Sequence, residues 1–454
     1  MSAPTATAMF RGGAARTGSY PVTWNAPRRS WRYRAGAWIK SSPVVVDQTV
    51  YVCALDGTVH AVDALSGAPR WTVPSRGKGV DSSPVVAAGS VYVCDGHVHA
   101  FDAPTGDLRW KVFTGEQGAS SPAFVDGLVI VGGPRWTLLA LDAETGELRW
   151  TRRIEACRFP GLPGSPPDLG AMESSPAVAD GTIYATGGGR LHALEAGTGQ
   201  LKWSADVRCS PMASPAVSAG AVYVTEGSGV CAVQASDGYI RWRTDVDSVM
   251  FRWGTVAVSG GTVLAGGELL EPGGALGSRI SGGVLVALDA ATGAIRWRYL
   301  TESGVEASPA AADGVAYLAT RGNSRHAARL TALDVISGSL HWWRWLPSGD
   351  YGGVVSSPAV AGGRVYLGLP NGELLAVPAD GESDRSSLLG RLSAWLRRSE
   401  RARLAGLLRS EPLAAAAAGL APDASLQGST AAGARSSLTG GIGCSVGPAQ
   451  RRWP

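Results

Sequence analysis

Two short patterns repeat along this chain at intervals of about 40 residues, and they restrict the possible folds more than any other feature. A tryptophan closes each repeat, and it stands at Trp31, Trp71, Trp110, Trp150, Trp203, Trp242, Trp297 and Trp342. A Ser-Ser-Pro or Ala-Ser-Pro opening ends at Pro43, Pro84, Pro122, Pro176, Pro215, Pro309 and Pro358, and Thr255 replaces the proline once. Self-similarity of this kind indicates a repeat architecture.

One complete repeat extends from Ser82 to Trp110. It contains four short apolar runs, at residues 84–86, 91–94, 98–101 and 108–112. Small-residue turns separate the runs, and the turn over 102–106 ends in a glycine that can adopt positive φ. Short runs joined by tight turns predict a four-stranded antiparallel meander.

The ends of the repeat array indicate a closed ring. Trp31 precedes the first opening, whereas the repeat that begins at Pro358 has no tryptophan after Ala376. A linear solenoid would leave both ends without partners. In a β-propeller the N-terminal strand can complete the last blade. We therefore predict an all-β, eight-bladed β-propeller of four-stranded antiparallel blades over residues 1–379, closed by the strand around Trp31.

A family resemblance supports this fold. The pattern Ala-x-Asp-x-x-Thr-Gly-x-x-x-Trp, at 100–110, 140–150 and 287–297, resembles the tryptophan-docking motif of pyrroloquinoline-quinone-like β-propeller repeats. Such repeats occur in quinoprotein alcohol dehydrogenases and in an outer-membrane assembly lipoprotein. The likeness covers roughly residues 9–379 and implies the fold, but one fold hosts many functions. Residues 9–18 resemble the family's lead-in, which we expect to pack across the ring closure.

The resemblance also implies where a cofactor would be held, and this chain departs from it. The dehydrogenases hold their quinone with an adjacent Cys-Cys ring and a calcium cage, but this chain has no Cys-Cys pair and no match to the catalytic aspartate. We predict that the quinone site and any other cofactor are absent. No nucleophile elbow, phosphate loop, paired CxxC or HExxH motif is present, so no catalytic residue is predicted.

Histidines at one repeat position argue against a metal shared between blades. His60, His99 and His192 each fall in the third strand of a different blade. That strand lies several spacings of about 4.8 Å from the axis. Zinc needs nitrogens at about 2.0–2.1 Å, so these three side chains predict half-buried strand residues and no metal site.

Long connections gather on one face of the predicted ring. With strands named A to D from the axis outward, the B–C and D-to-A connections emerge on the same face of a meander. The long segments are 151–173 and 343–355, both D-to-A, and 265–283 and 320–329, both B–C. Irregular loops collected on one face of a rigid scaffold are where binding usually resides. Neutral drift in loop length is the alternative.

Charged residues begin the innermost strands at the same face. They are Lys40, Asp81, Glu173, Arg252 and Glu306. We predict that they form a mixed-charge channel mouth for a polar or zwitterionic ligand; a solvated rim of paired charges is the alternative. In blade six, Trp253 beside Arg252 offers a stacking surface with a cation, so we rank this blade first for ligand contact. The alternative is a repeat that has decayed.

The repeats end after Ala379. Residues 384–410 predict a basic amphipathic helix, with seven arginines against Glu400 between 385 and 409. Such a helix can contact an anionic membrane peripherally or dock on a partner, or its apolar face can pack on the propeller. Residues 411–454 are rich in Ala, Gly and Ser, a composition typical of disorder.

Composition narrows the function further. A net charge of +4 is too small to indicate nucleic-acid binding. No secretory signal or membrane-spanning run is visible, so we predict a cytoplasmic protein. The six scattered cysteines include Cys53 and Cys94 at one strand position, which favours buried thiols. We favour a non-catalytic module that binds a protein or small polar ligand; the alternative is a tailoring or redox enzyme that uses the channel mouth, in a biosynthetic pathway.

Overall fold

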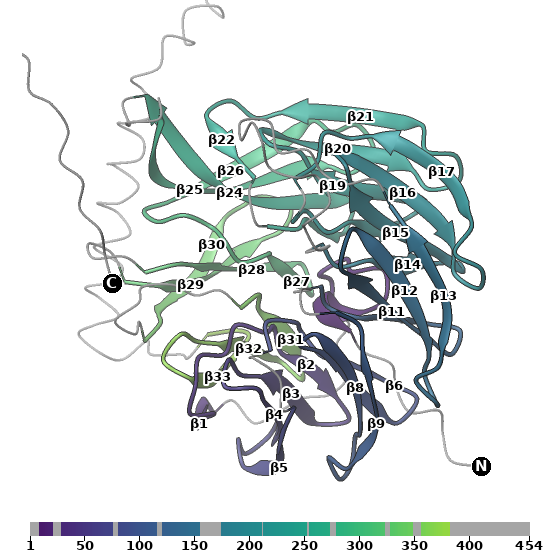
Figure 1. The fold of residues 1–454 in the computed structure, drawn as a ribbon. Helices are drawn as coiled ribbons and strands as arrows, with labels where there is room; N and C mark the ends of the chain where they lie inside the picture. The colour runs from purple at the N-terminus through teal and green to yellow at the C-terminus, as the bar shows by residue number, and fades with distance from the viewer. Residues whose placement is uncertain are drawn as a thin grey trace, which may run out of the picture. The chain divides into compact units, whose positions relative to one another are not determined.

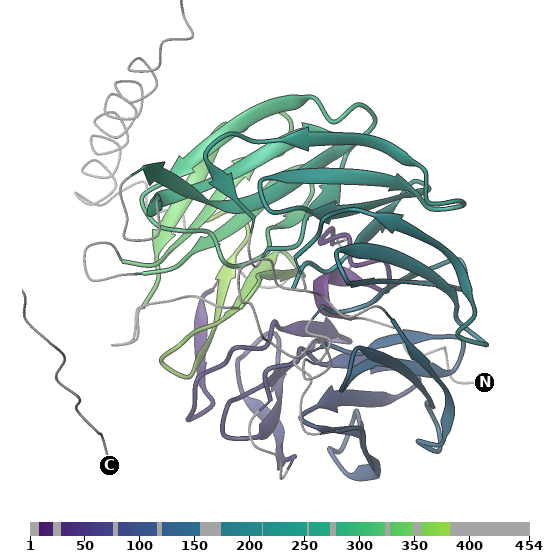
Figure 2. The same ribbon diagram turned by 45° about the horizontal axis from the view of Figure 1, so that its top comes forward.

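The computed structural model describes residues 9–20, 29–75, 80–115, 120–154, 174–210, 212–251, 254–272, 278–322, 327–347 and 356–381. These residues belong to one compact unit, which ends at Ser386. Eight antiparallel sheets stand around a central axis in this unit (Figures 1 and 2). The predicted helix over 384–410 and the tail over 411–454 lie outside the described residues.

Short strands build the first four blades. Blade one contains β2 (Val44–Val46), β3 (Thr49–Cys53), β4 (Thr58–Asp63) and β5 (Pro69–Pro74). Blade two contains β6 (Val85–Ala87), β7 (Ser90–Cys94), β8 (His97–Asp102) and β9 (Leu108–Phe113). Blade three contains β10 (Ala123–Val125), β11 (Leu128–Gly133), β12 (Thr137–Asp142) and β13 (Leu148–Arg153). Blade four contains β14 (Ala177–Ala179), β15 (Thr182–Gly187), β16 (Arg190–Glu195) and β17 (Leu201–Asp206).

The remaining blades follow the same meander, except for blade six. Blade five contains β18 (Ala216–Ser218), β19 (Ala221–Thr225), β20 (Gly229–Gln234) and β21 (Ile240–Asp245). Blade six contains β22 (Val249–Met250), β23 (Ala257–Ser259), β24 (Thr262–Pro272), β25 (Ser278–Asp289) and β26 (Ile295–Thr301). Blade seven contains β27 (Ala310–Ala312), β28 (Val315–Thr320), β29 (Arg329–Asp334) and β30 (Leu340–Trp345). Blade eight contains β31 (Ala359–Ala361), β32 (Arg364–Gly368), β33 (Glu373–Pro378) and the N-terminal β1 (Trp31–Arg34).

The N-terminal strand closes the ring. β1 pairs antiparallel with β33, and Trp31 lies opposite Ala376. This pairing confirms the prediction made from the unmatched ends of the repeat array. It also covers the outer edge of β33, which would otherwise be open to pairing with another chain.

The repeated tryptophans join neighbouring blades. Each indole Nε1 donates a hydrogen bond of 2.9–3.1 Å to a backbone carbonyl oxygen of the next blade. The acceptors, in blade order from Trp31 onward, are Ala64, Ala103, Ala143, Ala196, Ala235, Ala290, Val335 and Ala379. The repeat period therefore sets the spacing of identical inter-blade contacts.

The second serine of each opening links the inner strands. The backbone N–H of Ser42 donates to Ser83 Oγ at 2.9 Å, and the same contact recurs from blade to blade. The other pairs are Ser83 to Ser121, Ser121 to Ser175, Ser175 to Ser214, Thr255 to Ser308, Ser308 to Ser357, and Ser357 to Ser42. The buried hydroxyl of one opening thus accepts from the backbone amide of the preceding blade's opening, which lies before the first strand and has no strand partner.

Blade six differs from the prediction. Its sheet has five strands rather than four, and within the expected long loop over 265–283 the described residues 265–272 and 278–283 continue the strands β24 and β25. β22 pairs with the extension, where Met250 lies opposite Glu268. The extended hairpin therefore replaces an irregular B–C connection with a ladder of hydrogen bonds.

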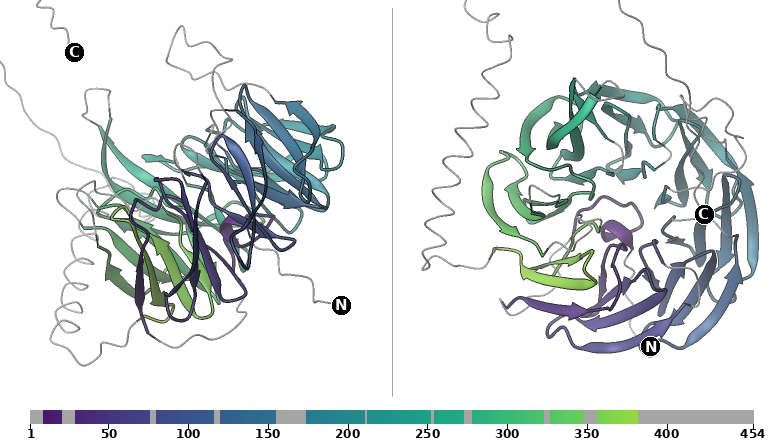
Figure 3. Two further views of the ribbon diagram at one scale, coloured as in Figure 1. Left: turned by 60° about the horizontal axis from the view of Figure 1, so that its bottom comes forward. Right: turned by 60° about the vertical axis from the view of Figure 1, so that its left-hand side comes forward.

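The N-terminal segment occupies the middle of the ring (Figure 3). Its short 3-10 helix η1 (Phe10–Gly12) precedes a stretch whose carbonyls accept from the amides of inner strands. The donors are Val178, Val217, Val258 and Ala311, in blades four to seven. The segment thus follows the inner strands along several blades, where we had expected it at the ring closure. Among the described residues, no helix is long and apolar enough to cross a membrane.

Candidate functional site

Two buried arginines anchor the N-terminal segment in the channel. Arg16 donates to the carbonyl oxygens of Ser121, Pro122 and Pro176, and Arg11 donates to that of Val256. Both side chains are essentially inaccessible to solvent. Burial lowers the pKa of Arg16 to about 9, and the facing carbonyl dipoles favour its charged form. The segment contacts inner strands close to their A–B turns, so it lies towards the face opposite the predicted binding face.

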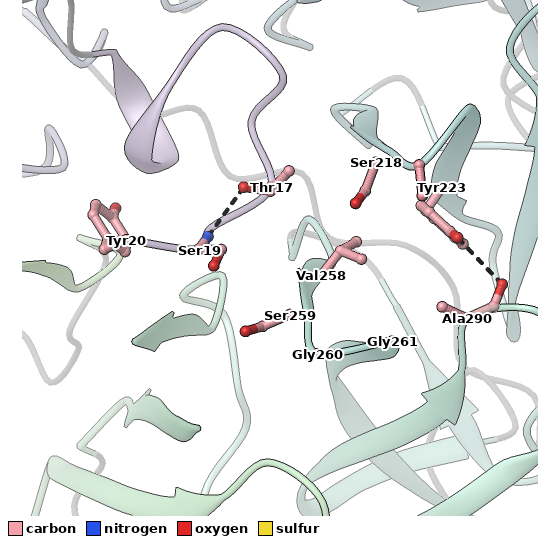
Figure 4. A pocket seen from close by; sticks show the side chains of 11 residues that line it. Thr17, Ser19, Tyr20, Ser218, Tyr223, Val258, Ser259, Gly260, Gly261 and Ala290 are labelled. Carbon is pink, nitrogen blue, oxygen red and sulfur yellow. Dashed lines mark hydrogen bonds between the residues drawn. The ribbon is translucent and has the colours of Figure 1, made fainter. Parts of the chain in front are cut away.

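A pocket of about 510 Å³ lies beside this segment (Figure 4). Its walls are Thr17, Ser19 and Tyr20 of the segment, with Ser218 and Ser259 near the A–B turns of blades five and six. Figure 4 shows that Thr17 Oγ1 accepts from the Ser19 amide and that Tyr223 donates to the Ala290 carbonyl. The hydroxyl-rich wall offers hydrogen bonds without a charged group. No sequence pattern had singled out this pocket.

At the opposite mouth, two of the predicted charged residues form an ion pair. Lys40 Nζ lies 2.7 Å from Asp81 Oδ2, which joins blade one to blade two. Both side chains remain more than a third exposed. A pair this exposed contributes little to stability, so its charges remain available to a ligand.

A third predicted residue, Glu306, pairs with a residue of its own blade. Arg321 Nη1 lies 2.6 Å from Glu306 Oε1, and Arg321 follows the end of β28. The carboxylate of Glu268, on the extended β24, is buried close by. A Cβ atom placed on Gly304 would lie 3.3 Å from Glu268 Oε1 and 3.8 Å from Arg321 Nε. Blades six and seven therefore bring two carboxylates and one guanidinium together around Gly304.

Glu173, Arg252 and Trp253 lie outside the described residues. The ranking of blade six as the first ligand contact therefore stays a prediction. The alternative interpretation, a solvated rim of paired charges, expects ion pairs such as Lys40–Asp81 and Glu306–Arg321. Whether the mouth binds a ligand also stays a prediction.

An aromatic cluster in blade seven was missed by the sequence interpretation. The guanidinium carbon of Arg329 lies 5.3 Å from the ring centroid of Trp343, and its Nη2 donates to Tyr299 Oη at 2.7 Å. Trp345 packs edge-on against Trp343 at 5.0 Å and is 50% exposed. The run of three tryptophans at 342–345, where other blades have one, was the available signal. Since β30 leads into a D-to-A connection, this cluster lies toward the predicted binding face.

The cysteines are buried as the sequence indicated, whereas the third-strand histidines are more deeply buried than the predicted half-buried residues. Cys53, Cys94, Cys209 and Cys231 are buried thiols, and Cys209 Sγ donates to the Arg190 carbonyl oxygen at 3.7 Å. His60, His99 and His192 are all buried in their strands. His60 Nε2 lies 2.7 Å from Thr58 Oγ1, and His192 Nε2 donates to the Gly187 carbonyl at 3.2 Å. These two imidazoles are satisfied within their own blades.

Known proteins share this fold and its repeats. The family model described as outer membrane protein assembly factor BamB matches residues 22–94, 165–283 and 227–389, more than half of the chain. BamB of Yersinia pestis is 30% identical over 214 residues, 44% of this chain and 44% of that protein. The serine/threonine-protein kinase AfsK of Streptomyces coelicolor is 30% identical over 187 residues, 41% of this chain and 21% of the kinase. The chain thus spans less than half the length of these relatives.

Solved structures agree on the fold. The quinohemoprotein alcohol dehydrogenase of Comamonas testosteroni aligns with a TM-score of 0.65 at 18% identity, over 83% of this chain and 80% of the enzyme. BamB of Moraxella catarrhalis aligns with a TM-score of 0.58 at 16% identity, over 76% of this chain and 98% of that protein. At such identities the likeness establishes the architecture alone. The family match and the ring of eight repeats together show that this chain belongs to the PQQ-like β-propeller repeat family, whose matching model is described as outer membrane protein assembly factor BamB.

Proposed function

We propose that this chain is a non-catalytic binding module that holds a protein partner on its loop-rich face, the face with the B–C and D-to-A connections. The observation that carries the proposal is the exposed Trp345, which packs on the partly buried Trp343 and the buried Arg329 toward that face. Exposed tryptophan backed by arginine is the composition of binding hot spots. The charged pairs Lys40–Asp81 and Glu306–Arg321 would supply the polar rim.

The family relatives support a protein partner over a small ligand. Several of them are named as outer membrane protein assembly factors. The channel geometry supports the choice of face, since the N-terminal segment fills the channel toward the opposite end. The cytoplasmic location and the absence of the quinone cofactor remain part of this proposal as predictions.

Native mass spectrometry of the chain purified from its own host tests the proposal first. We expect a complex with a second protein, and we expect Trp345→Ala to release that protein. Tyr239→Ala is the matched control, because Tyr239 is 70% exposed and lies in a C–D turn on the opposite face. Retention by the Tyr239 variant and loss by the Trp345 variant would support the proposal. Equal retention by both variants would contradict the choice of face.

An enzyme remains the second candidate because other relatives are named quinohemoprotein alcohol dehydrogenases. In that case the channel mouth would hold a small molecule. Denaturation of the natively purified chain would then release an organic molecule whose mass differs from that of any protein. Such a release would favour the enzyme, and its loss on Glu306→Gln would place it at the mouth.

A further inference from the structure

Blade two carries three metal-ligating side chains that converge at its B–C turn. Asp95 lies in the turn, and His97 and His99 follow on β8 with their side chains on one face of the strand. One ligand atom from each residue lies within 4.8 Å of the others. His99 Nε2 is 3.0 Å and His97 Nδ1 is 3.7 Å from Asp95 Oδ1. His97 and His99 lie in the same blade, whereas His60 and His192 lie in other blades.

Ser75 hydrogen-bonds to the Asp95 carboxylate, but two polar atoms of the cluster lack a partner within the described part of the chain. The side chains of Asp95 and His99 are 0% and 1% exposed. Asp95 Oδ2 and His97 Nδ1 are both buried, and neither has a hydrogen-bond partner within 3.5 Å among the described residues. A buried carboxylate oxygen without a donor is costly, so it requires an explanation. A cation at this position would satisfy both atoms together.

The equivalent position in blade one provides an internal comparison. There Asp56, Thr58 and His60 occupy the places of Asp95, His97 and His99. Thr58 Oγ1 donates to Asp56 Oδ1 at 2.5 Å and lies 2.7 Å from His60 Nε2, so hydrogen bonds complete that network. In blade two an imidazole replaces the hydroxyl, and the network stays open. Blade four has Arg190 at this position, which cannot ligate a metal.

We propose that Asp95, His97 and His99 form a binding site for one divalent transition-metal cation, with Zn²⁺ as the best match. Two imidazole nitrogens and one carboxylate are a common three-ligand set for zinc, and a fourth position stays open for water or another ligand. Zinc bonds of about 2.0–2.1 Å require ligand atoms about 3.3 Å apart, close to the spacings of 3.0 and 3.7 Å. The ring of His97 is 32% exposed and gives the cation a route from solvent.

Zinc titration of the full-length chain after chelator treatment tests this site. We expect one equivalent of Zn²⁺ to bind, and Co²⁺ in its place to give the visible absorption of a four-coordinate site. His97→Thr copies the residue that blade one has at this position, so the fold accepts it. We expect this variant to bind Zn²⁺ at least tenfold more weakly.

A thermal scan provides a second, independent readout. Zn²⁺ should raise the unfolding midpoint of the wild type, because a ligand that binds only the folded state stabilises it, and it should leave His97→Thr unchanged. His341→Ala is the control, since His341 is a surface histidine distant in sequence from this cluster. Equal zinc binding by wild type and His97→Thr, or no stoichiometric binding by the wild type, would overturn the proposal. Neither result depends on the protein partner proposed above.

Discussion

The tryptophan contact can be tested one residue at a time because neighbouring blades satisfy the acceptor differently. The Ala143 carbonyl accepts from Trp110 Nε1 and also from Tyr92 Oη at 3.0 Å. The Ala196 carbonyl accepts from Trp150 Nε1 at 2.9 Å, but blade three has Ile130 at the tyrosine position. Replacing Trp150 therefore leaves the Ala196 carbonyl without a donor. After replacement of Trp110, the Ala143 carbonyl still accepts from Tyr92.

We expect Trp150→Phe to lower the free energy of unfolding more than Trp110→Phe. A buried acceptor left without any donor costs about 1–3 kcal/mol, whereas losing one of two donors costs about 0.5–1.5 kcal/mol. Denaturant unfolding of both variants measures the difference. The double variant Tyr92→Phe/Trp110→Phe should then cost more than the sum of its two single changes. Simple additivity would show that the shared carbonyl does not couple them.

The turn aspartates predict how stability responds to acid. Asp289 accepts from Arg296 Nη2 at 2.6 Å and from the Thr292 amide, and these bonds lower its pKa to about 2. A depressed pKa in the folded state contributes stability above the unfolded pKa of about 3.9. That contribution is lost as the pH falls through about 2.

We therefore expect Asp289→Asn to destabilise the protein near neutral pH and to have little effect near the folded pKa. Unfolding midpoints of the variant and the wild type, measured across that pH range, should converge as the pH falls. A gap that stays constant with pH would mean that the carboxylate charge is not what stabilises this turn.

At the scale of the element, each C–D turn places a glycine against the tryptophan of the preceding blade. Gly146 has φ +76°, and a Cβ there would lie 2.8 Å from the Trp110 ring. Gly127, in the A–B turn of the same blade, also has φ +76°, but a Cβ there would meet nothing within 4 Å. The two glycines differ only in what they face.

Gly146→Ala and Gly127→Ala thus separate packing from backbone conformation. Both substitutions introduce a left-handed alanine, which costs about 1–2 kcal/mol. Gly146→Ala also forces the tryptophan aside, and overpacking adds about 1–3 kcal/mol. We expect the midpoint of chemical unfolding to fall further for Gly146→Ala. Similar midpoints for both variants would show that the turn and Trp110 can shift to accommodate the added methyl group without loss of stability.

The elements that the sequence predicted well are those with a strict repeat. Trp31 and the missing tryptophan after Ala376 were enough to predict the pairing of β1 with β33. The extended hairpin of blade six was not predicted, because Gly266, Gly267 and Gly283 interrupt its strand pattern. In the structure these glycines permit close contact: a Cβ on Gly283 would lie 2.5 Å from the Ser303 carbonyl oxygen. Glycine in a strand can thus mark close approach of a neighbour rather than a loop.

The candidate site was only partly predictable for a related reason. Period-two alternation predicted Lys40, Asp81 and Glu306 as the heads of innermost strands, but these strands begin later, at Val44, Val85 and Ala310. The alternation also could not show the ion-pair partners of the three residues. A comparison of equivalent positions in different blades cannot reveal the proposed metal site of blade two, because Asp95, His97 and His99 share one turn and one strand. Arg11 and Arg16 are polar in sequence, and nothing local indicates that carbonyls of distant blades would bury them.

At the scale of the whole molecule, the N-terminal segment is a non-local tie across the ring. It accepts from four inner-strand amides in four successive blades, and Arg16 donates to blades three and four. Its removal would leave these amides and carbonyls to water in the channel. If each hydrogen bond contributes about 0.5–1.5 kcal/mol net, the four amide bonds alone stabilise the ring by on the order of 4 kcal/mol.

We expect a chain that lacks residues 1–20 to unfold at a lower denaturant concentration than one that lacks only residues 1–8. The shorter deletion is the matched control, because it keeps Met9, the first described residue, whose sulfur accepts from the Phe124 amide. Hydrogen exchange provides the sharper test: the amides of Val178, Val217, Val258 and Ala311 should exchange faster in the longer deletion. A peptide of residues 9–20 added in trans should restore their protection. If these amides stay protected without the segment, the inner strands hold the ring alone, and the segment fills the channel without stabilising it.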